Sequence, residues 1–186
     1  MKKRCFWVSD DPLYIEYHDN EWGVPVYEDD KLFEFLILET FQAGLSWITV
    51  LKKRGNFREA FDSFDYKKIA NYGEEKFEEL LQNAGIIRNK LKIKATITNA
   101  QAFMKVQEEF GSFSKYIWGF VNGKPIKNSF SKREEVPATT ELSDAISKDL
   151  KKRGFKFVGS TVIYAHMQAT GMVNDHTTDC FRYSEV

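Results

Sequence analysis

The chain turns at Lys151-Lys152-Arg153-Gly154-Phe155-Lys156-Phe157-Val158-Gly159, between two segments of helical pattern. Before this turn, residues 143–153 place Ile146 and Leu150 on one face. After it, residues 160–170 are largely apolar. The glycines Gly154 and Gly159 allow close backbone approach and positive φ. The pattern predicts a helix-hairpin-helix over about residues 143–170.

Such a turn offers free N–H groups at the start of its second helix, where partial positive charge collects. Lysines flank it on both sides, and on DNA the matching anion is a phosphate. Gly154, Lys156 and Gly159 are therefore candidate contacts to a DNA backbone. An ordinary αα-hairpin with a solvated basic face is the more common meaning of such a segment taken alone.

Nearly all of the remaining chain has the apolar spacing of helices. We predict helices from residue 29 and over residues 46–54, 57–64, 65–72, 74–83, 90–107 and 113–121. Residues 122–140 contain Gly123, Pro125 and Pro137 and are predicted to be a loop. The expected fold class is all-α, with residues 1–186 in a single domain.

Composition agrees with a globular domain and excludes several other classes. The chain has 186 residues, of which 42% are hydrophobic, and its formal net charge is zero. No stretch approaches the roughly 18 apolar residues of a membrane span, and no signal peptide is recognisable. We expect a cytoplasmic protein with no membrane partner. Zero net charge gives no global electrostatic argument for binding nucleic acid.

Two cysteines and two histidines lie near the ends of the chain in metal-ligand spacing. Cys5 and His18 enclose twelve residues, and His176 and Cys180 enclose three. Together they make a tetrahedral Cys2His2 set, which leaves no open position for water and so indicates one structural Zn²⁺ per chain. Such a site would join the two termini. A disulfide between the two cysteines is the weaker alternative.

Glu39 lies on an apolar stripe. It follows Leu32 by seven residues, Phe35 by four and Leu36 by three, so it shares their helix face. A carboxylate there is costly unless it is paired or used in function. The alternative is that Glu39 ends its helix and turns to solvent.

Aromatic residues gather in the N-terminal part of the chain, where Trp7, Tyr14 and Tyr17 are followed by Trp47, eight residues after Glu39. Aromatic faces near a carboxylate are able to hold a flat or cationic ligand, although most such clusters are core. His166 has no partner by spacing and is expected to be an ordinary helix residue.

Several longer sequence motifs resemble those of a known protein family. They are Arg4-Cys5, Trp7-Val8, residues 11–15, residues 17–25 (YHDNEWGVP), residues 42–47 (QAGLSW), residues 84–88 (AGIIR), residues 151–159 and residues 173–176 (VNDH). This set resembles the 3-methyladenine DNA glycosylase I family of the helix-hairpin-helix superfamily, from Arg4 to Cys180. Phe6 and Thr40-Phe41 depart from the family pattern. Phe41 is expected beside the pocket.

The resemblance implies roles for particular residues. The zinc ligands would be the four nominated by spacing. The base pocket would hold Glu39 with Trp7, Tyr14, Tyr17 and Trp47. Leu45 would wedge into the gap left by a flipped nucleotide, assisted by Gln42, and the hairpin would grip the DNA backbone.

The implied activity is hydrolytic excision of 3-methyladenine from double-stranded alkylated DNA by a monomer, with the free base as product and an abasic site left behind. No lysine nucleophile is evident, which favours a monofunctional enzyme without lyase activity. Asp175 is interpreted as structural. Two alternatives are a zinc-stabilised DNA-binding module without catalysis and a helical protein that binds a cationic metabolite.

Overall fold

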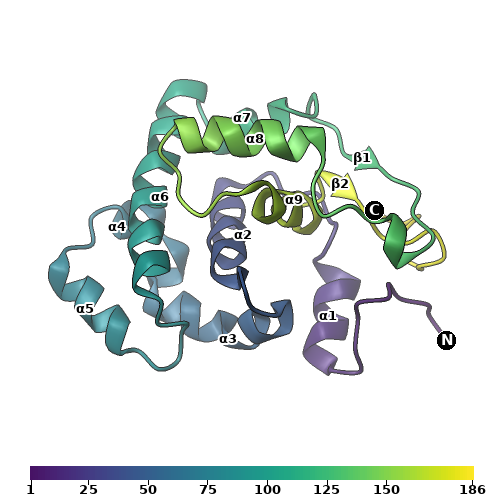
Figure 1. Cartoon of the computed structure of the whole chain (residues 1–186), viewed down its shortest axis with the longest axis horizontal. Coiled ribbons are helices and arrows are strands. Elements are labelled where there is room, and N and C mark those ends of the chain that lie inside the picture. The colour runs from purple at the N-terminus through teal and green to yellow at the C-terminus, as the bar shows by residue number, and fades with distance from the viewer.

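Helix α2 (Asp29–Gln42) lies at the centre of the molecule (Figure 1). The computed structural model describes every residue from Met1 to Val186. From Leu32 to Phe41, all of α2 except Glu34 is buried, since α3, α6, α7 and α9 pack around it. A helix that is apolar on most of its faces is stable only in such a surrounding.

Nine α-helices make up most of the fold, which confirms the all-α prediction. Besides α2 they are α1 (Pro12–Asn20), α3 (Trp47–Ala60), α4 (Tyr66–Ile69), α5 (Glu74–Gln82), α6 (Lys90–Phe110), α7 (Phe113–Gly119), α8 (Glu141–Lys152) and α9 (Ser160–Ala169). Short 3-10 helices are η1 (Asp62–Phe64) and η2 (Arg133–Glu135), and β1 (Ile126–Lys127) pairs in parallel with β2 (Val173–Asn174).

Helices α1 and α3 differ from the sequence prediction. Helix α1 was not predicted, although Asp11 caps it by accepting a hydrogen bond from the Leu13 N–H and Pro12 occupies its first turn. The predicted helices over 46–54 and 57–64 are largely one helix, α3, which continues through Gly55. Glycine weakens a helix interior by only about 1 kcal/mol, and the buried Phe57 supplies packing beyond it.

The two ends of the chain lie on the same side of the molecule (Figure 1). The backbone N–H of Phe181 donates to the carbonyl oxygen of Lys3, so the terminal segments are in direct contact. One hydrophobic core of 41 buried residues runs from Cys5 to Cys180.

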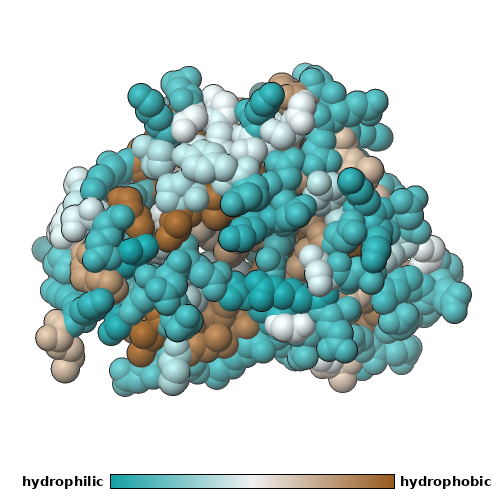
Figure 2. All heavy atoms as spheres, turned by 180° about the vertical axis from the view of Figure 1, so that it is seen from behind, coloured by the Kyte–Doolittle hydropathy of each residue, from teal (hydrophilic) through white to brown (hydrophobic).

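The outer surface is predominantly hydrophilic on the face opposite to that of Figure 1, with apolar residues in small patches (Figure 2). None of the helices has both the length and the apolar character needed to cross a bilayer.

Candidate functional site

A cavity of about 230 Å³ opens beside α1 and the C-terminal half of α2. It is lined by Phe6, Trp7, Tyr14, Tyr17, Trp22, Glu39, Gln42, Trp47, Val136, Ala165, Gln168 and Asp175. The five residues that the sequence nominated for the pocket are all in this wall. The contributions of the 122–140 loop and of α9 were not anticipated, because no local pattern shows that these segments reach the same cavity as α1.

The aromatic walls are held against one another. Ring centroids lie 5.1 Å apart for Trp7 and Tyr14, 6.4 Å for Trp7 and Tyr17, and 5.4 Å for Tyr17 and Trp47. The rings are tilted by 43–60° in these pairs, an arrangement that aromatic quadrupoles favour. The cavity is therefore preformed and presents several π faces.

Glu39 is buried, with 3% of its surface exposed, so the solvent-facing alternative is wrong. Its carboxyl group forms no hydrogen bond within the chain, which is unusual for a buried acid. Burial alone raises the pKa of Glu39 to about 8. The cavity thus holds a buried acid to which the chain itself offers no hydrogen-bond partner.

Two further polar groups belong to residues that line the cavity. The Nε1–H of Trp47 is buried without an acceptor. Burial, and after it the charge of Glu39, raise the pKa of the Tyr17 hydroxyl well above its ordinary value, so it stays protonated. A carboxyl group, an indole N–H and π faces together suit a planar ligand with polar edges.

Asp175 also lines the cavity, but unlike Glu39 it is fully engaged. Its carboxylate accepts hydrogen bonds from Asn128 Nδ2 at 2.7 Å, from Gln168 Nε2 at 2.9 Å and from the Tyr164 hydroxyl. These donors come from the 122–140 loop and from α9. Asp175 therefore ties both segments to β2, in agreement with the structural role expected from the sequence.

Leu45 stands at the tip of the turn after α2, with 39% of its surface exposed. The Nε2 group of Gln42 donates to the carbonyl oxygen of Leu45 at 2.8 Å and braces this turn. The expectation that Phe41 lies beside the pocket is wrong. Phe41 points to the opposite side of α2, where its ring lies 4.8 Å from that of Phe57.

The turn between α8 and α9 differs in one detail from the sequence prediction. Gly154 has φ +94°, as expected, but Gly159 has φ −58° and needs no glycine for its conformation. The left-handed residue is instead Phe157, at φ +55°. A side chain at Gly159 would meet nothing within 4 Å, so glycine there leaves the start of α9 open to a large group from outside.

The basic residues of the turn divide into two sets. Lys151, Lys152 and Lys156 are exposed and free to meet an anion. Arg153 is not: it pairs with Asp149 at 2.7 Å and Glu109 at 2.6 Å. The Arg153 guanidinium is therefore less available to an anion than the ammonium groups of the three lysines.

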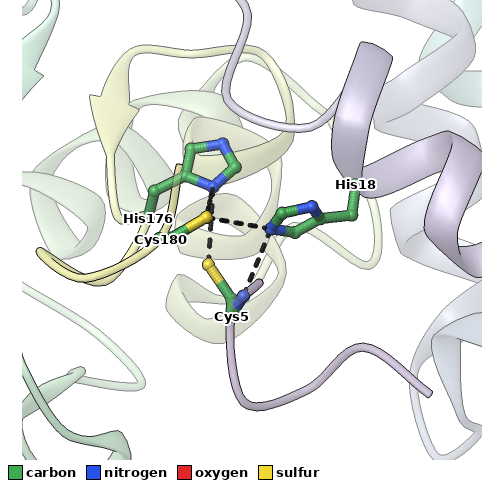
Figure 3. Close-up of side chains that lie close together, drawn as sticks. All are labelled: Cys5, His18, His176 and Cys180. Atoms are coloured by element: carbon green, nitrogen blue, oxygen red, sulfur yellow. Dashed lines mark hydrogen bonds between the residues drawn. The ribbon is translucent and has the colours of Figure 1, made fainter. Parts of the chain in front are cut away.

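Cys5, His18, His176 and Cys180 form a buried cluster (Figure 3). The rings of Trp7 and Trp22, which line the cavity, contact His18 and His176 of this cluster. Their ligand atoms all lie within 4.8 Å of one another. Three sulfur-to-nitrogen distances are 3.4 Å (Cys5 to His176 Nδ1), 3.5 Å (Cys180 to His18 Nε2) and 3.6 Å (Cys180 to His176). The four side chains that the spacing nominated thus lie together in the structure.

These distances fit a tetrahedral zinc ion. Zn–S bonds of about 2.3 Å and Zn–N bonds of about 2.0–2.1 Å give S···N edges of about 3.6 Å. The remote ring nitrogens are also engaged: His18 Nδ1 lies 2.7 Å from Asp19 Oδ1, and His176 Nε2 lies 2.9 Å from the carbonyl oxygen of Trp22. Such outer hydrogen bonds fix the tautomers of metal-binding histidines. The free cysteines form no disulfide.

His166, the third histidine, is a packed helix residue. Its Nε2 lies 3.0 Å from the carbonyl oxygen of Leu32. Burial lowers the pKa of this imidazole to about 4, so it is neutral at physiological pH. It joins α9 to α2 and takes no part in either site.

Comparison with known proteins shows the family to which the chain belongs. Residues 7–183 match the family model described as methyladenine glycosylase. DNA-3-methyladenine glycosylase 1 of Escherichia coli (strain K12) is 54% identical over 181 residues, covering 97% of each chain. A crystal structure of 3-methyladenine DNA glycosylase I superposes with a TM-score of 0.93 at 56% identity, covering 96% of this chain and 98% of that one. Another, of a variant in complex with 3-methyladenine, has a TM-score of 0.93 at 35% identity and covers 96% of each. The chain belongs to the methyladenine glycosylase family.

Proposed function

We propose that this protein is a monofunctional DNA-3-methyladenine glycosylase, which acts as a monomer in the cytoplasm on double-stranded alkylated DNA. It releases free 3-methyladenine and leaves an abasic site. The observation that carries the proposal is Glu39, a buried carboxyl group without a partner in an aromatic cavity. Neither a DNA-binding module without catalysis nor a purely structural core gives that group a purpose.

Recognition would depend on charge and shape together. Methylation at N3 makes adenine in DNA cationic, so it is attracted to the π faces of Trp7, Tyr14, Tyr17 and Trp47. Glu39 accepts hydrogen bonds from the N–H groups of the base, and charge-assisted bonds of this kind are worth roughly 1.5–3 kcal/mol. A cation beside Glu39 lowers its pKa, so binding the base releases the proton that the empty pocket holds. Normal adenine lacks the charge and gains less.

Bond cleavage needs little help from an acid. The bond between C1′ and the base nitrogen breaks with both electrons going to the base, which leaves as a neutral molecule because it began as a cation. Water then bonds to C1′ and loses a proton. No lysine lines the cavity, which supports release of the base without a covalent enzyme–sugar intermediate and without strand cleavage.

Access to the base requires it to leave the duplex, since the reacting atoms are buried in the stack. Leu45, at the exposed tip beside the cavity, would enter the gap, and Gln42 would brace the turn. The turn at Gly154 and Gly159, with the exposed Lys156, would hold the phosphate backbone.

The four-residue cluster would hold one structural Zn²⁺ through Cys5 Sγ, His18 Nε2, His176 Nδ1 and Cys180 Sγ. Four protein ligands leave no open position on the ion, so its contribution is to stability. It would tie the N-terminal segment to the C-terminal segment, and Trp7 and Trp22 lie between the cluster and the cavity. The metal thereby supports the pocket wall.

The test is release of free base from DNA methylated in vitro, measured by chromatography under single-turnover conditions. Wild type should release 3-methyladenine, and the DNA should break only after alkali treatment. Glu39→Gln should be slower by about one to two decades, as loss of a charge-assisted bond implies. Glu16→Gln, an exposed glutamate of α1, is the matched control and should keep the wild-type rate. The proposal fails if wild type releases no methylated base.

A further inference from the structure

Helix α6 carries two buried polar side chains that face loops rather than solvent. Lys92 is 7% exposed and Asn99 is fully buried. They are seven residues apart, so they share one face of the helix, separated by about 10 Å along its axis. Neither side chain meets a charged partner: both bond only to backbone groups of other segments.

Lys92 fastens the turn that carries Leu45. Its Nζ group donates hydrogen bonds to the carbonyl oxygens of Phe41 at 2.9 Å and Ala43 at 2.7 Å. Helix α2 ends there in a tight turn, with its C-cap Ala43 at φ −51° and ψ 119° and Gly44 at φ +81°. An ammonium group satisfies the free carbonyls and suits the negative end of the helix dipole.

Asn99 fastens the turn between α8 and α9. Its Nδ2 group donates to the carbonyl oxygen of Lys156 at 3.0 Å, and its Oδ1 accepts from the Lys156 N–H at 2.7 Å. Figure 1 shows this turn passing beside α6. The next residue, Phe157, has the strained φ of +55°, so the pair of bonds holds a conformation that the turn would not keep by itself.

We propose that α6 is the positioning element that fixes the wedge turn and the hairpin at one separation, through Lys92 and Asn99. This rests on the proposed function, in which both turns touch the same DNA. A rigid helix spanning both turns sets how far the wedge stands from the gripped phosphates. Small misplacements of such contacts are enough to slow a reaction by about 100-fold.

The first experiment replaces Lys92 by methionine, which keeps the packed stem and removes both donated bonds. Single-turnover excision from duplex DNA should fall by about 10- to 100-fold. Affinity for free 3-methyladenine, read by tryptophan fluorescence, should change less than about twofold, because the cavity wall is untouched. Lys105→Met, at an exposed lysine of the same helix, should leave both values unchanged. Lys92→Gln, which keeps one donor, should recover part of the rate and replaces the methionine variant if that one does not fold.

A double-mutant cycle with Leu45→Gly separates positioning from stability. If Lys92 acts through the wedge, Lys92→Met should cause no further loss in the Leu45→Gly background. Additive losses, an equal loss of free-base affinity, or no effect of Leu45→Gly would each overturn the proposal. Wild type failing to release base would instead refute the proposed function, so the two failures are distinct.

Asn99→Leu, which keeps the branching and the number of side-chain heavy atoms, tests the other end of α6. It should weaken binding to abasic DNA while leaving free-base affinity unchanged, and Lys156→Ala should add less in this background than in wild type. Unchanged DNA affinity in Asn99→Leu would overturn the role of Asn99.

Discussion

The Cys5, His18, His176 and Cys180 cluster and the aromatic cavity are neighbours, but they differ in whether their buried polar groups have partners. In the cluster, His18 and His176 point one nitrogen at the cysteines and engage the other with Asp19 and a carbonyl group. In the cavity, Glu39 and the Trp47 N–H are buried with no partner. Satisfied buried groups stabilise a fold, whereas unsatisfied ones cost stability and gain a partner when a ligand arrives. The difference distinguishes a structural site from a binding site.

The strongest test of this comparison is at the metal. Chelation, or Cys180→Ser, should lower the free energy of unfolding by about 5 kcal/mol, which is less than the roughly 10–16 kcal/mol of isolated zinc peptides because the core remains. For a chain of this length the melting temperature should fall by about 10–20 °C. Elemental analysis should find one zinc per chain. An absence of metal together with an unchanged melting temperature would contradict the comparison.

The second test is the pH dependence of Glu39. Since burial raises its pKa from 4.5 to about 8, the folded chain holds a proton in this range that the unfolded chain has lost. The free energy of unfolding should therefore decrease as the pH rises from about 5 to about 8. Glu39→Gln should raise it by about 2–4 kcal/mol at pH 8 and hardly at all at pH 5.

Denaturant titrations at both pH values measure this effect, with Glu16→Gln as the control. Identical pH profiles for wild type and Glu39→Gln would show that the carboxyl group is not held unpaired. A variant that is more stable yet slower in excision would sharpen the contrast between the two regions.

The helical class and the clustering of Cys5, His18, His176 and Cys180 could both be predicted from the sequence, because each depends on residue spacing. It also placed Glu39 on a buried stripe. The rest of the cavity wall could not be predicted in this way. Val136 and Gln168 carry no local signal, since their place in the wall depends on tertiary packing of the loop and α9. Helix α1 was missed despite the start signal at Asp11-Pro12.

Two expectations, the place of Phe41 and the positive φ of Gly159, were wrong because both depend on tertiary contacts. The stripe argument located Glu39 correctly, but it could not tell which side of α2 faces the cavity, so Phe41 was misplaced. In the turn after α8, composition suggested positive φ at Gly159, whereas tertiary contacts through Asn99 hold Phe157 in that region instead. Long-range hydrogen bonds decide such details and leave no trace in local sequence.

The third test concerns Trp47, whose N–H lacks an acceptor. Trp47→Phe keeps an aromatic face and removes the donor. Affinity for free 3-methyladenine should fall by about 3- to 10-fold, the worth of one neutral hydrogen bond, while stability of the free protein should not fall. Calorimetric titration and thermal melts give both quantities. A loss of stability with unchanged affinity would mean that the indole N–H serves the fold rather than a ligand.

The smallest effect is expected at Phe6, on the open side of the cavity. Phe6 is 47% exposed, and the Arg133 guanidinium lies 5.8 Å from its ring centre. An exposed face of this kind contributes about 0.5–1 kcal/mol, so Phe6→Gly should weaken free-base binding by about two- to fivefold. Arg133→Gln should give a similar or smaller loss if its role is to hold the ring. A loss of tenfold or more at Phe6 would show that the open side of the cavity, rather than the buried wall around Glu39, dominates recognition. It would contradict the view that the buried groups without partners are the ones that bind the base.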